Sequence, residues 1–153
     1  MPILLPSSLR FPDRPGLHLI IGDPIAHSLS PLIYNSLYQR YQMPIQAMTC
    51  RVASADLPAF FQLLPGLDLC ALNVTLPHKE RVIPHLHWVE SDALTQRSVN
   101  TIVPAEGGMT GYSTDGLGFS LSLTEIGASM AQKRILLLGN GGAAAAIAWQ
   151  AVK

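Results

Sequence analysis

The hydrophobic positions of this chain follow two spacings that alternate along the sequence. Short runs of apolar and β-branched residues predict β-strands at residues 17–21, 45–52, 69–74, 99–103, 109–112 and 134–138. Apolar residues three or four positions apart predict helices at residues 31–41, 55–64, 79–83, 90–96, 116–126 and 141–153. Strands that alternate with helices predict an α/β fold with an open, mostly parallel sheet and helices on both faces.

Some of these segments carry more detailed expectations. The helix predicted at residues 31–41 has one apolar stripe, formed by Leu32, Ile33, Leu37 and Tyr38. An amphipathic helix usually buries such a face. The run at residues 69–74 is nearly all apolar, which is typical of a strand buried on both faces. Gly107 and Gly108 separate two predicted strands and indicate a hairpin.

The order of the predicted elements divides the chain into three parts. Residues 1–16 are interrupted by prolines and predict an extended leader without a role in the core. Residues 17–114 predict one α/β domain, and residues 115–153 a linking helix followed by one strand and one helix. A single βα unit cannot cover its own apolar faces, so we expect a truncated second domain. That part is expected to be mobile or to pack against a second copy, which makes a homodimer one assembly to consider.

Composition and charge exclude several classes of protein. The 153 residues include 10 Lys+Arg and 10 Asp+Glu, so the formal net charge is zero and offers no basic surface for nucleic acid or an anionic membrane. No apolar run approaches the roughly 20 residues that span a bilayer. Hydrophobic residues make up 48% of the chain, enough for a packed core.

Cysteine and histidine usage predicts neither disulfides nor a metal site. Cys50 and Cys70 are the only cysteines in the sequence, and they predict free thiols in a reducing cytoplasm. The five histidines lack the spacing of metal ligands, so no metal is expected. We therefore expect a cytoplasmic protein.

A glycine-rich segment between the last predicted strand and helix is typical of dinucleotide binding. It fits the pattern G-x-G-x-x-A, with the residues Gly139, Asn140, Gly141, Gly142, Ala143 and Ala144. Gly139 allows the turn, Gly141 allows a pyrophosphate to approach the backbone, and the helix start offers free N–H groups to phosphate. The alternative is a tight turn that binds nothing. The residue that distinguishes NAD from NADP usually follows about 20 positions later, so this choice stays open.

Two serines lie near the start of a predicted helix. Ser30 followed by Pro31 is a typical N-cap and first helical residue. Together with Ser28, this helix start is suited to holding a carboxylate. The alternative is a helix cap and a serine turn with no ligand.

Further polar residues follow or begin predicted strands. Asn73 and Thr75 lie at the carboxyl end of the strand at 69–74, where α/β proteins bind ligands. Lys79 is expected at the start of the next helix, where the helix dipole disfavours a positive charge. This unfavourable position indicates a functional role for Lys79. The alternative is a solvated surface lysine. Asp115 opens a helix and could be a simple N-cap. Asn100 begins a strand and indicates little alone.

Five stretches in this order resemble the shikimate dehydrogenase family from Gly22 onward. They are Gly22-x-Pro24-Ile25-x-His27-Ser28-x-Ser30-Pro31, Asn73-Val74-Thr75-x-Pro77-x-Lys79, Val99-Asn100-Thr101, Thr114-Asp115-Gly116 and Gly139-x-Gly141-Gly142-Ala143. The chain departs from the family pattern where Tyr34 replaces a histidine, Arg97-Ser98 replaces Gly-Ala and Ser113 replaces an asparagine. We expect Ser113 to loosen the loop that presents Asp115.

The resemblance implies an NADP-dependent oxidoreductase that interconverts 3-dehydroshikimate and shikimate in chorismate and aromatic amino-acid biosynthesis. It implies that Ser28 and Ser30 bind the substrate carboxylate, and that the ring hydroxyls are held by Asn73, Thr75, Asn100 and Asp115. It also implies that Lys79 and Asp115 form the catalytic pair, with proton transfer favoured at Lys79. The cofactor would lie against Gly139, Asn140, Gly141, Gly142 and Ala143. A polypeptide of residues 1–153 alone is expected to bind shikimate weakly and to be inactive.

Three alternatives remain. A quinate or dual quinate/shikimate dehydrogenase often has a changed residue in the serine pair, and both Ser28 and Ser30 are intact. A non-catalytic shikimate-binding module would not need both Lys79 and Asp115. A purely structural truncated product would share the sequence and lack activity.

Overall fold

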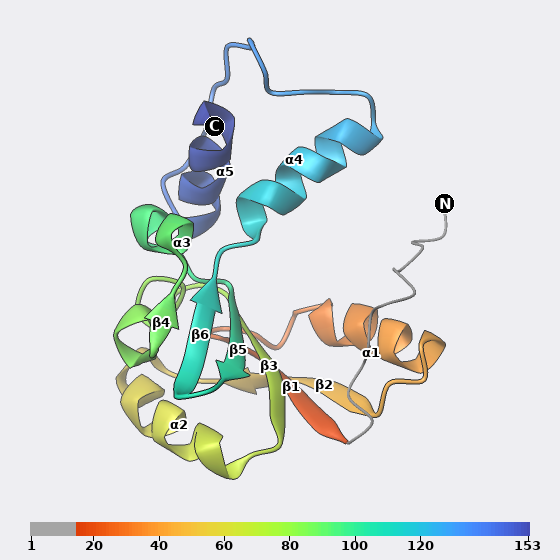
Figure 1. Cartoon of the computed structure of the whole chain (residues 1–153), viewed down its shortest axis with the longest axis vertical. Helices are drawn as coiled ribbons and strands as arrows, with labels where there is room; N and C mark the ends of the chain where they lie inside the picture. The colour runs from red at the N-terminus through yellow and green to blue at the C-terminus, as the bar shows by residue number, and fades with distance from the viewer. Residues whose placement is uncertain (1–14) are drawn as a thin grey trace.

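The computed structural model describes residues 15–153, which form one α/β sheet domain with two further helices above it (Figure 1). The strands are β1 (Gly16–Gly22), β2 (Ile45–Arg51), β3 (Leu69–Val74), β4 (Trp88–Val89), β5 (Thr101–Ala105) and β6 (Gly108–Tyr112). The α-helices are α1 (Ser30–Arg40), α2 (Leu57–Leu63), α3 (Ser91–Gln96), α4 (Asp115–Glu125) and α5 (Gly142–Val152). Short 3-10 turns cover Ser54–Asp56, Leu64–Gly66 and Ile83–His85. Most of the expected leader lies outside the described residues, and Gly16 already begins β1.

The sheet has the strand order β2-β1-β3-β5-β6-β4. β1 pairs in parallel with β2 and β3, and β6 pairs in parallel with β4, whereas β5 is antiparallel to both of its neighbours. The predicted fold class, a mostly parallel α/β sheet, is therefore confirmed. Because β5 runs against β3, the start of β5 and the end of β6 lie at the same sheet edge as the carboxyl ends of β1 and β3.

Helices cover both faces of the sheet, as predicted. On one face α2 packs on the larger core, which includes Leu19, Ile21, Leu57, Leu72 and Ile102. On the other face Tyr34 and Tyr38 of α1 pack against a smaller cluster of Ile20, Ile25 and Ala47. Alternate residues of β1 therefore point to different helices, as expected for a strand buried on both sides.

The predicted apolar stripe of α1 is wrong for Leu32, Ile33 and Leu37, which are exposed, and right for Tyr38. Leu32 is 68% exposed and Ile33 is 58% exposed, while Tyr34 and Tyr38 face the sheet. The side chain of Asn35 explains this orientation, because it donates to the carbonyl of Ala47 (2.9 Å) and accepts from its N–H (2.7 Å). These groups belong to the edge strand β2, and satisfying them fixes which side of α1 faces the sheet.

Two predicted elements are absent from the part of the chain that the structure describes. The segment predicted as a helix at residues 79–83 forms turns instead, and these lead into the 3-10 turn Ile83–His85. Prolines at 77 and 84 leave too few residues between them for a stable helix. Residues 134–138 are not a strand, since no neighbouring strand pairs with them and Leu136 and Leu138 are 83% and 88% exposed. The expected βα unit is thus represented by α5 alone.

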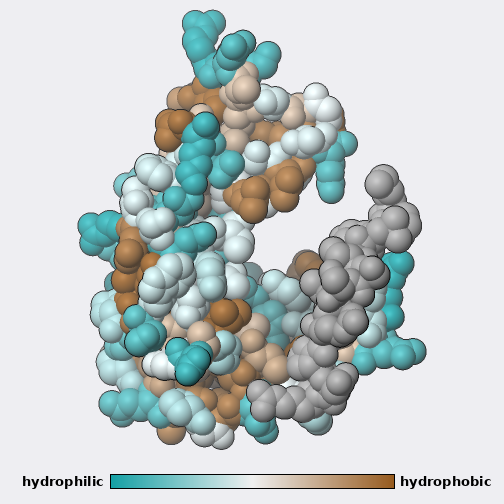
Figure 2. Space-filling model, viewed as in Figure 1, coloured by the Kyte–Doolittle hydropathy of each residue, from teal (hydrophilic) through white to brown (hydrophobic). Residues whose placement is uncertain are grey.

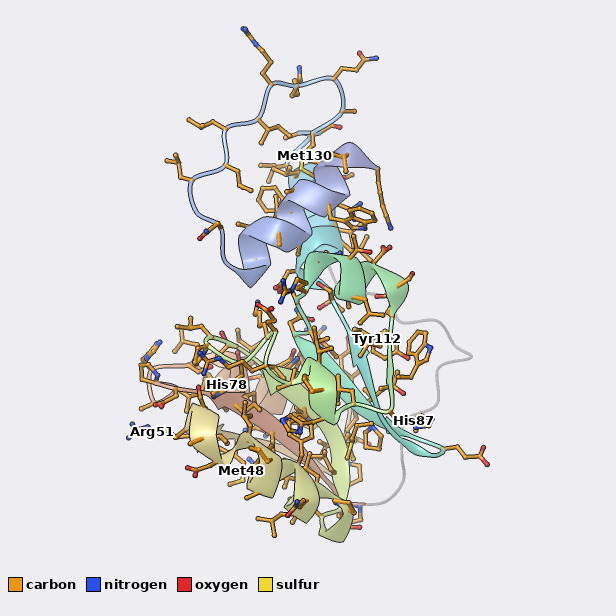
Figure 3. All side chains as sticks on the ribbon, turned by 90° about the vertical axis from the view of Figure 1, so that its left-hand side faces the viewer. Met48, Arg51, His78, His87, Tyr112 and Met130 are labelled. Carbon is orange, nitrogen blue, oxygen red and sulfur yellow. The ribbon has the colours of Figure 1, made fainter. Side chains whose placement is uncertain are left out.

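Helices α4 and α5 lie side by side above the sheet (Figures 1 and 3). Their contact is close at Gly116, where an added Cβ would lie 2.4 Å from the carbonyl oxygen of Ala146. α5 also contacts α3, so its start is held above the sheet edge. None of the helices within residues 15–153 is long and apolar enough to cross a membrane.

Candidate active site

The carboxyl ends of β1 and β3 bring the predicted polar residues to one edge of the sheet. The N–H of Thr75 donates to the carbonyl of Ile21 (2.9 Å), and the N–H of Asp23 donates to the carbonyl of Leu76 (3.1 Å). The loops that follow the two strands are thereby joined. Figure 2 shows a hollow between this part of the molecule and α4 above it. The edge is the place where open α/β sheets bind ligands.

Lys79 and Asp115 form an ion pair at this edge. Nζ of Lys79 donates to Oδ2 of Asp115 at 2.5 Å, and the two side chains are 19% and 26% exposed. Lys79 lies in a turn rather than at a helix start, so the helix-dipole argument for its use is wrong. The turn is anchored by the fully buried His78 (Figure 3), whose Nε2 donates to the carbonyl of Val52 at 2.7 Å. The ion pair is therefore partly shielded from solvent, and the turn that carries Lys79 is held in place by His78.

Asn100 completes the cluster. Its Nδ2 donates to Oδ1 of Asp115 at 2.6 Å, so each carboxylate oxygen of Asp115 accepts one hydrogen bond from this cluster. Its Oδ1 accepts from the N–H of Thr114 (3.0 Å) and from the hydroxyl of Thr101 (3.0 Å). The sequence analysis gave Thr101 and Thr114 no role of their own. Their place beside Asn100 and Asp115 in the matched stretches is the signal that could have found them.

Asn73 is connected to Asn100 rather than left free. Its Nδ2 donates to the backbone carbonyl of Asn100 (3.1 Å) and to Oγ1 of Thr101 (3.3 Å). Its Oδ1 accepts from Nε2 of His18 at 2.8 Å. The structure therefore places Asn73 beside Asn100 and Thr101, and the sequence analysis missed His18. A histidine inside the apolar run at residues 17–21 was the available signal.

His18 is 3% exposed and lies against α1. Burial lowers the pKa of its imidazole from 6.5, and the hydrogen bond with Asn73 opposes part of this change. The unfolded chain therefore binds a proton more readily than the folded chain below pH 6.5, so the stability contributed by neutral His18 is present above that pH and is lost as the pH falls.

We therefore expect the free energy of unfolding to fall between pH 7.5 and pH 5.5. Denaturant titrations at the two pH values measure it. The variant His18→Gln, which cannot titrate, should lose less stability over this interval. An equal loss in His18→Gln would contradict the assignment to His18.

Ser28 and Ser30 lie at the start of α1, as predicted, but the cap is different. Leu29 is the N-cap residue and Ser30 is the first residue of the helix. The N–H of Ser30 donates to the hydroxyl oxygen of Ser28 at 3.3 Å, which leaves the Ser28 hydroxyl hydrogen able to donate to a ligand. Both serines are half-buried, as is Thr75 on the neighbouring loop. No hydrogen bond within residues 15–153 joins these three side chains to Lys79 or Asp115.

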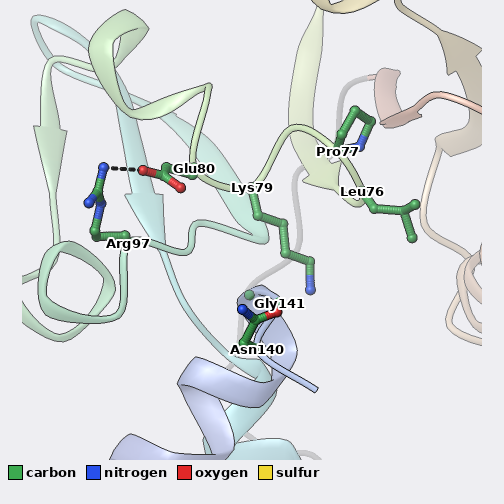
Figure 4. Close-up of a pocket in the computed structure, with 8 residues that line it drawn as sticks. Leu76, Pro77, Lys79, Glu80, Arg97, Asn140 and Gly141 are labelled. Carbon is green, nitrogen blue, oxygen red and sulfur yellow. Dashed lines mark ion pairs between the residues drawn. The ribbon is translucent and has the colours of Figure 1, made fainter.

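The glycine-rich segment lies next to Lys79. A cavity of about 270 Å³ is lined by Leu76, Pro77, Lys79, Glu80, Arg97, Asn140, Gly141 and Gly142. Figure 4 shows the ammonium group of Lys79 pointing toward Asn140 and Gly141. Gly139, with φ of 119°, and Ala143 lie outside this lining. The segment that resembles a dinucleotide site is thus brought to the ion pair.

The start of α5 fits the pyrophosphate of a dinucleotide. Gly141 is the N-cap residue, without a side-chain cap, so the first N–H groups of the helix are available to an anion. Among residues 15–153, apart from its chain neighbours, nothing lies within 4 Å of an added Cβ at Gly141, which leaves its backbone open to a ligand. At Gly142 an added Cβ would lie 2.6 Å from Oγ of Ser98 and 3.1 Å from Cδ of Lys79. Glycine therefore suits both positions.

The structure explains two departures from the family pattern. Ser113 does not leave its loop untethered, because its hydroxyl donates to Oε1 of Gln96 at 2.5 Å. Arg97 adopts a φ of 49°, the left-handed conformation that glycine accepts most easily, and its guanidinium pairs with Glu80 (Figure 4). Within residues 15–153 no cluster of His, Cys, Asp and Glu could hold a metal ion.

The fold and the site together define a class: an α/β domain with an ion pair and carboxamides at the carboxyl ends of parallel strands, beside a glycine-rich helix start. Residues 20–102 match the family described as "Shikimate dehydrogenase substrate binding domain". Because this match covers more than half of the sequence, the chain belongs to the shikimate dehydrogenase family.

Curated relatives agree with this assignment. The protein named "Shikimate dehydrogenase (NADP(+))" from Carboxydothermus hydrogenoformans is 41% identical over 141 residues, which are 92% of this chain and 50% of the relative. The protein of the same name from Moorella thermoacetica is 42% identical over 134 residues, 88% of this chain and 45% of the relative. The chain spans about half the length of the curated relatives it matches.

Solved structures share the fold. A shikimate dehydrogenase in complex with NADP⁺ has a TM-score of 0.86 and 30% identity, covering 95% of this chain and 50% of that chain. The enzyme from Thermus thermophilus in complex with shikimate has a TM-score of 0.83 and 30% identity, covering 90% and 52%. The 5-ketofructose reductase of a Gluconobacter species has a TM-score of 0.81 and 30% identity, covering 92% and 50%. Enzymes named for different substrates therefore share this architecture.

Proposed function

We propose that the protein carrying this chain is an NADP-dependent shikimate dehydrogenase that reversibly reduces 3-dehydroshikimate to shikimate, and that this chain supplies its substrate site. The observation that carries the proposal is the cluster of Lys79, Asp115 and Asn100, with Lys79 facing the glycine-rich start of α5. Membership of the family and the names of its relatives supply the substrate and cofactor. The function of the whole protein is part of the proposal.

In the proposed reaction the Lys79–Asp115 pair handles the proton of the reacting oxygen. Both carboxylate oxygens of Asp115 already accept hydrogen bonds, from Lys79 and from Asn100. Lys79 has further N–H donors, because an ammonium group carries three. We therefore assign to Lys79 the proton given to the carbonyl oxygen in reduction and taken from the hydroxyl in oxidation, and to Asp115 the orientation of Lys79.

Cofactor binding is proposed for the segment from Gly139 to Ala143, with the N–H groups at the start of α5 directed at the pyrophosphate. When bound, NADP would supply or accept the hydride at the substrate carbon. Asn140, Gly141 and Gly142 line the cavity that Lys79 shares, which supports a short distance between cofactor and substrate.

The carboxylate of shikimate is proposed to bind the hydroxyls of Ser28 and Ser30, and the ring hydroxyls to bind near Asn73, Thr75, Asn100 and Asp115. The asparagines and Asp115 are already hydrogen-bonded to one another, so the site is preorganised rather than assembled by the ligand. A substrate hydroxyl would have to share or replace one of these bonds.

Calorimetric titration with shikimate tests the proposed function. Replacing Ser28 by alanine should weaken binding by about 10- to 100-fold, since hydrogen bonds to charged groups contribute about 1.5–3 kcal/mol. Ser36 provides the matched control, because its exposed hydroxyl donates to the carbonyl of Leu32 within α1, and Ser36→Ala should leave the affinity unchanged. If the unaltered protein does not bind shikimate, the proposed substrate is wrong.

Quinate is the competing substrate, and titration of both acids on the same sample ranks them. Intact Ser28 and Ser30 favour shikimate. A non-catalytic binding module is the competing class. It would bind shikimate and would show no turnover, with or without Lys79.

We also propose a cytoplasmic location, supported by the free half-buried thiols of Cys50 and Cys70.

A further inference from the structure

A chain of hydrogen bonds crosses the sheet from α1 to the ion pair, and its direction follows from one backbone group. The carbonyl of Asn100 can only accept, so the atom of Asn73 that contacts it at 3.1 Å must be the amide nitrogen. Oδ1 of Asn73 therefore faces His18. This amide oxygen is an acceptor only, so the hydrogen in its contact with Nε2 must belong to the imidazole, which therefore carries its hydrogen on Nε2.

The other ring nitrogen of neutral His18 is then an acceptor. Its partner is the hydroxyl of Tyr38, which donates to Nδ1 at 2.6 Å. Burial, together with the neighbouring Tyr34 and Cys70, raises the pKa of Tyr38 to about 12, so the hydroxyl keeps the hydrogen that it donates. Tyr38 thus selects the tautomer of His18 that Asn73 requires.

The same direction continues beyond Asn73. Because Asn73 donates to Oγ1 of Thr101, the Thr101 hydroxyl is free to donate to Oδ1 of Asn100. With Oδ1 of Asn100 accepting from Thr101 and from the N–H of Thr114, its Nδ2 faces Asp115 and donates to the carboxylate. Every group from Tyr38 to Asn100 donates to the next, and the chain ends on a negative charge, the arrangement in which hydrogen bonds strengthen one another.

We propose that His18 is a positioning residue of the active site, which fixes the amide of Asn73 and, through Thr101, the orientation of Asn100 beside Asp115. The proposal deepens the proposed function, because it names a determinant of the same site. His18 touches neither substrate nor cofactor and acts through Asn73.

Within residues 15–153, His18 has no charged neighbour in its hydrogen bonds or ring contacts. Its ring lies 4.3 Å from that of Tyr34 and 6.0 Å from that of Tyr38, both on α1, and among the described residues its nitrogens bind Tyr38 and Asn73 alone. Packing alone could be supplied by an apolar ring of similar size. What such a ring cannot supply is the donor to Asn73, and this difference makes the proposal testable.

The decisive comparison is His18→Phe against His18→Gln, in the full chain titrated with shikimate. Phenylalanine keeps a ring and removes the donor, whereas the amide nitrogen of glutamine reaches nearly as far as Nε2 and retains an N–H. We expect His18→Phe to weaken shikimate binding by about tenfold, the effect of one lost hydrogen bond, and His18→Gln to restore most of the affinity. Equal affinities in the two variants would overturn the proposal.

A second pair of variants removes one hydroxyl inside the chain of hydrogen bonds and one outside it. Tyr38→Phe removes the donor to His18, and we expect weaker shikimate binding. Tyr34→Phe removes a hydroxyl that takes no part in this chain of hydrogen bonds. The ring of Tyr34 contacts the same imidazole, and this variant should bind shikimate like the unaltered protein. Equal losses in both would show that packing around His18, rather than the hydrogen bonds, matters.

Nitrogen NMR of the free protein separates failure of the inference from failure of the proposed function. We expect His18 to show a hydrogen on Nε2 and none on Nδ1, and the side-chain amide of Asn100 to be protected from exchange. Protection should be lost in His18→Phe and kept in His18→Gln. The opposite tautomer, or unchanged protection in His18→Phe, would overturn the inference. Absence of shikimate binding by the unaltered protein would reject the proposed substrate while leaving this measurement valid.

Discussion

Replacing Lys79 by alanine is expected to lower turnover by about 10²- to 10⁴-fold, the usual effect of removing a general acid–base group. The assay uses a protein that carries this chain together with a complete nucleotide-binding domain, with shikimate and NADP⁺ as substrates. The Michaelis constant for shikimate should change less than turnover, because the proton transfer is made in the transition state. Lys79 contacts Asp115 at 2.5 Å and lines the cavity shared with the glycine-rich segment.

The variant Lys79→Arg distinguishes proton transfer from electrostatic positioning. Arginine keeps the positive charge and can still pair with Asp115, but it does not release its proton in proteins. We therefore expect Lys79→Arg to bind shikimate and to turn over slowly. The exposed Lys133 offers a matched control, and Lys133→Ala should be as active as the unaltered protein. Turnover close to normal in Lys79→Ala would make Lys79 a surface lysine and reject the mechanism.

The segments that carry the site could be predicted because their residues follow strands. Asn73 lies near the end of a strand that the apolar run at residues 69–74 predicts correctly, and Thr75 directly follows it. The later hairpin of β5 and β6 brings Asn100 and Asp115 to the same edge. The carboxyl ends of β1, β3 and β6 meet at this edge, and β5, which is antiparallel to β3 and β6, begins there, so proximity follows from this topology. The hydrogen bonds themselves depend on side-chain geometry that spacing does not contain.

Two mistaken elements show where the sequence pattern lacks information. Residues 134–138 have the composition of a strand, but a strand needs a partner, and none lies beside them in the part of the chain described. The stripe of Leu32 and Ile33 on α1 was outweighed by Asn35, which satisfies the edge of β2. In both cases a contact distant in sequence decided the local structure.

His18 could not be assigned a role from the sequence for a related reason. A histidine within an apolar strand indicates burial, yet its partners Tyr38 and Asn73 are 20 and 55 positions away. Only the register of β1 with β3, which pairs His18 with Ala71 and Ile20 with Asn73, brings the imidazole to the carboxamide. The chain of donors that ends at Asp115 is therefore a property of the fold.

Two glycines of α4 should respond in opposite directions to the same substitution. At Gly116 an added Cβ would lie 2.4 Å from the backbone oxygen of Ala146, which cannot rotate away, so α5 must shift. We expect Gly116→Ala to lower the free energy of unfolding by about 1–3 kcal/mol, the usual cost of overpacking. At Gly118 no described atom beyond the helix's own backbone and the chain neighbours lies within 4 Å of an added Cβ, so Gly118→Ala should raise the free energy of unfolding by up to about 1 kcal/mol through helix propensity.

Denaturant titration of the two variants measures this difference, with Gly118→Ala serving as the matched control for Gly116→Ala. A second measurement connects the contact to function. Because the contact at Gly116 holds α5 against α4, its loss should displace Gly141 and Gly142 from Lys79 and weaken NADP⁺ binding, in a protein with a complete nucleotide-binding domain. Gly118→Ala should leave NADP⁺ binding unchanged. Equal stabilities of the two variants would show that α5 is not packed on α4 as the structure has it.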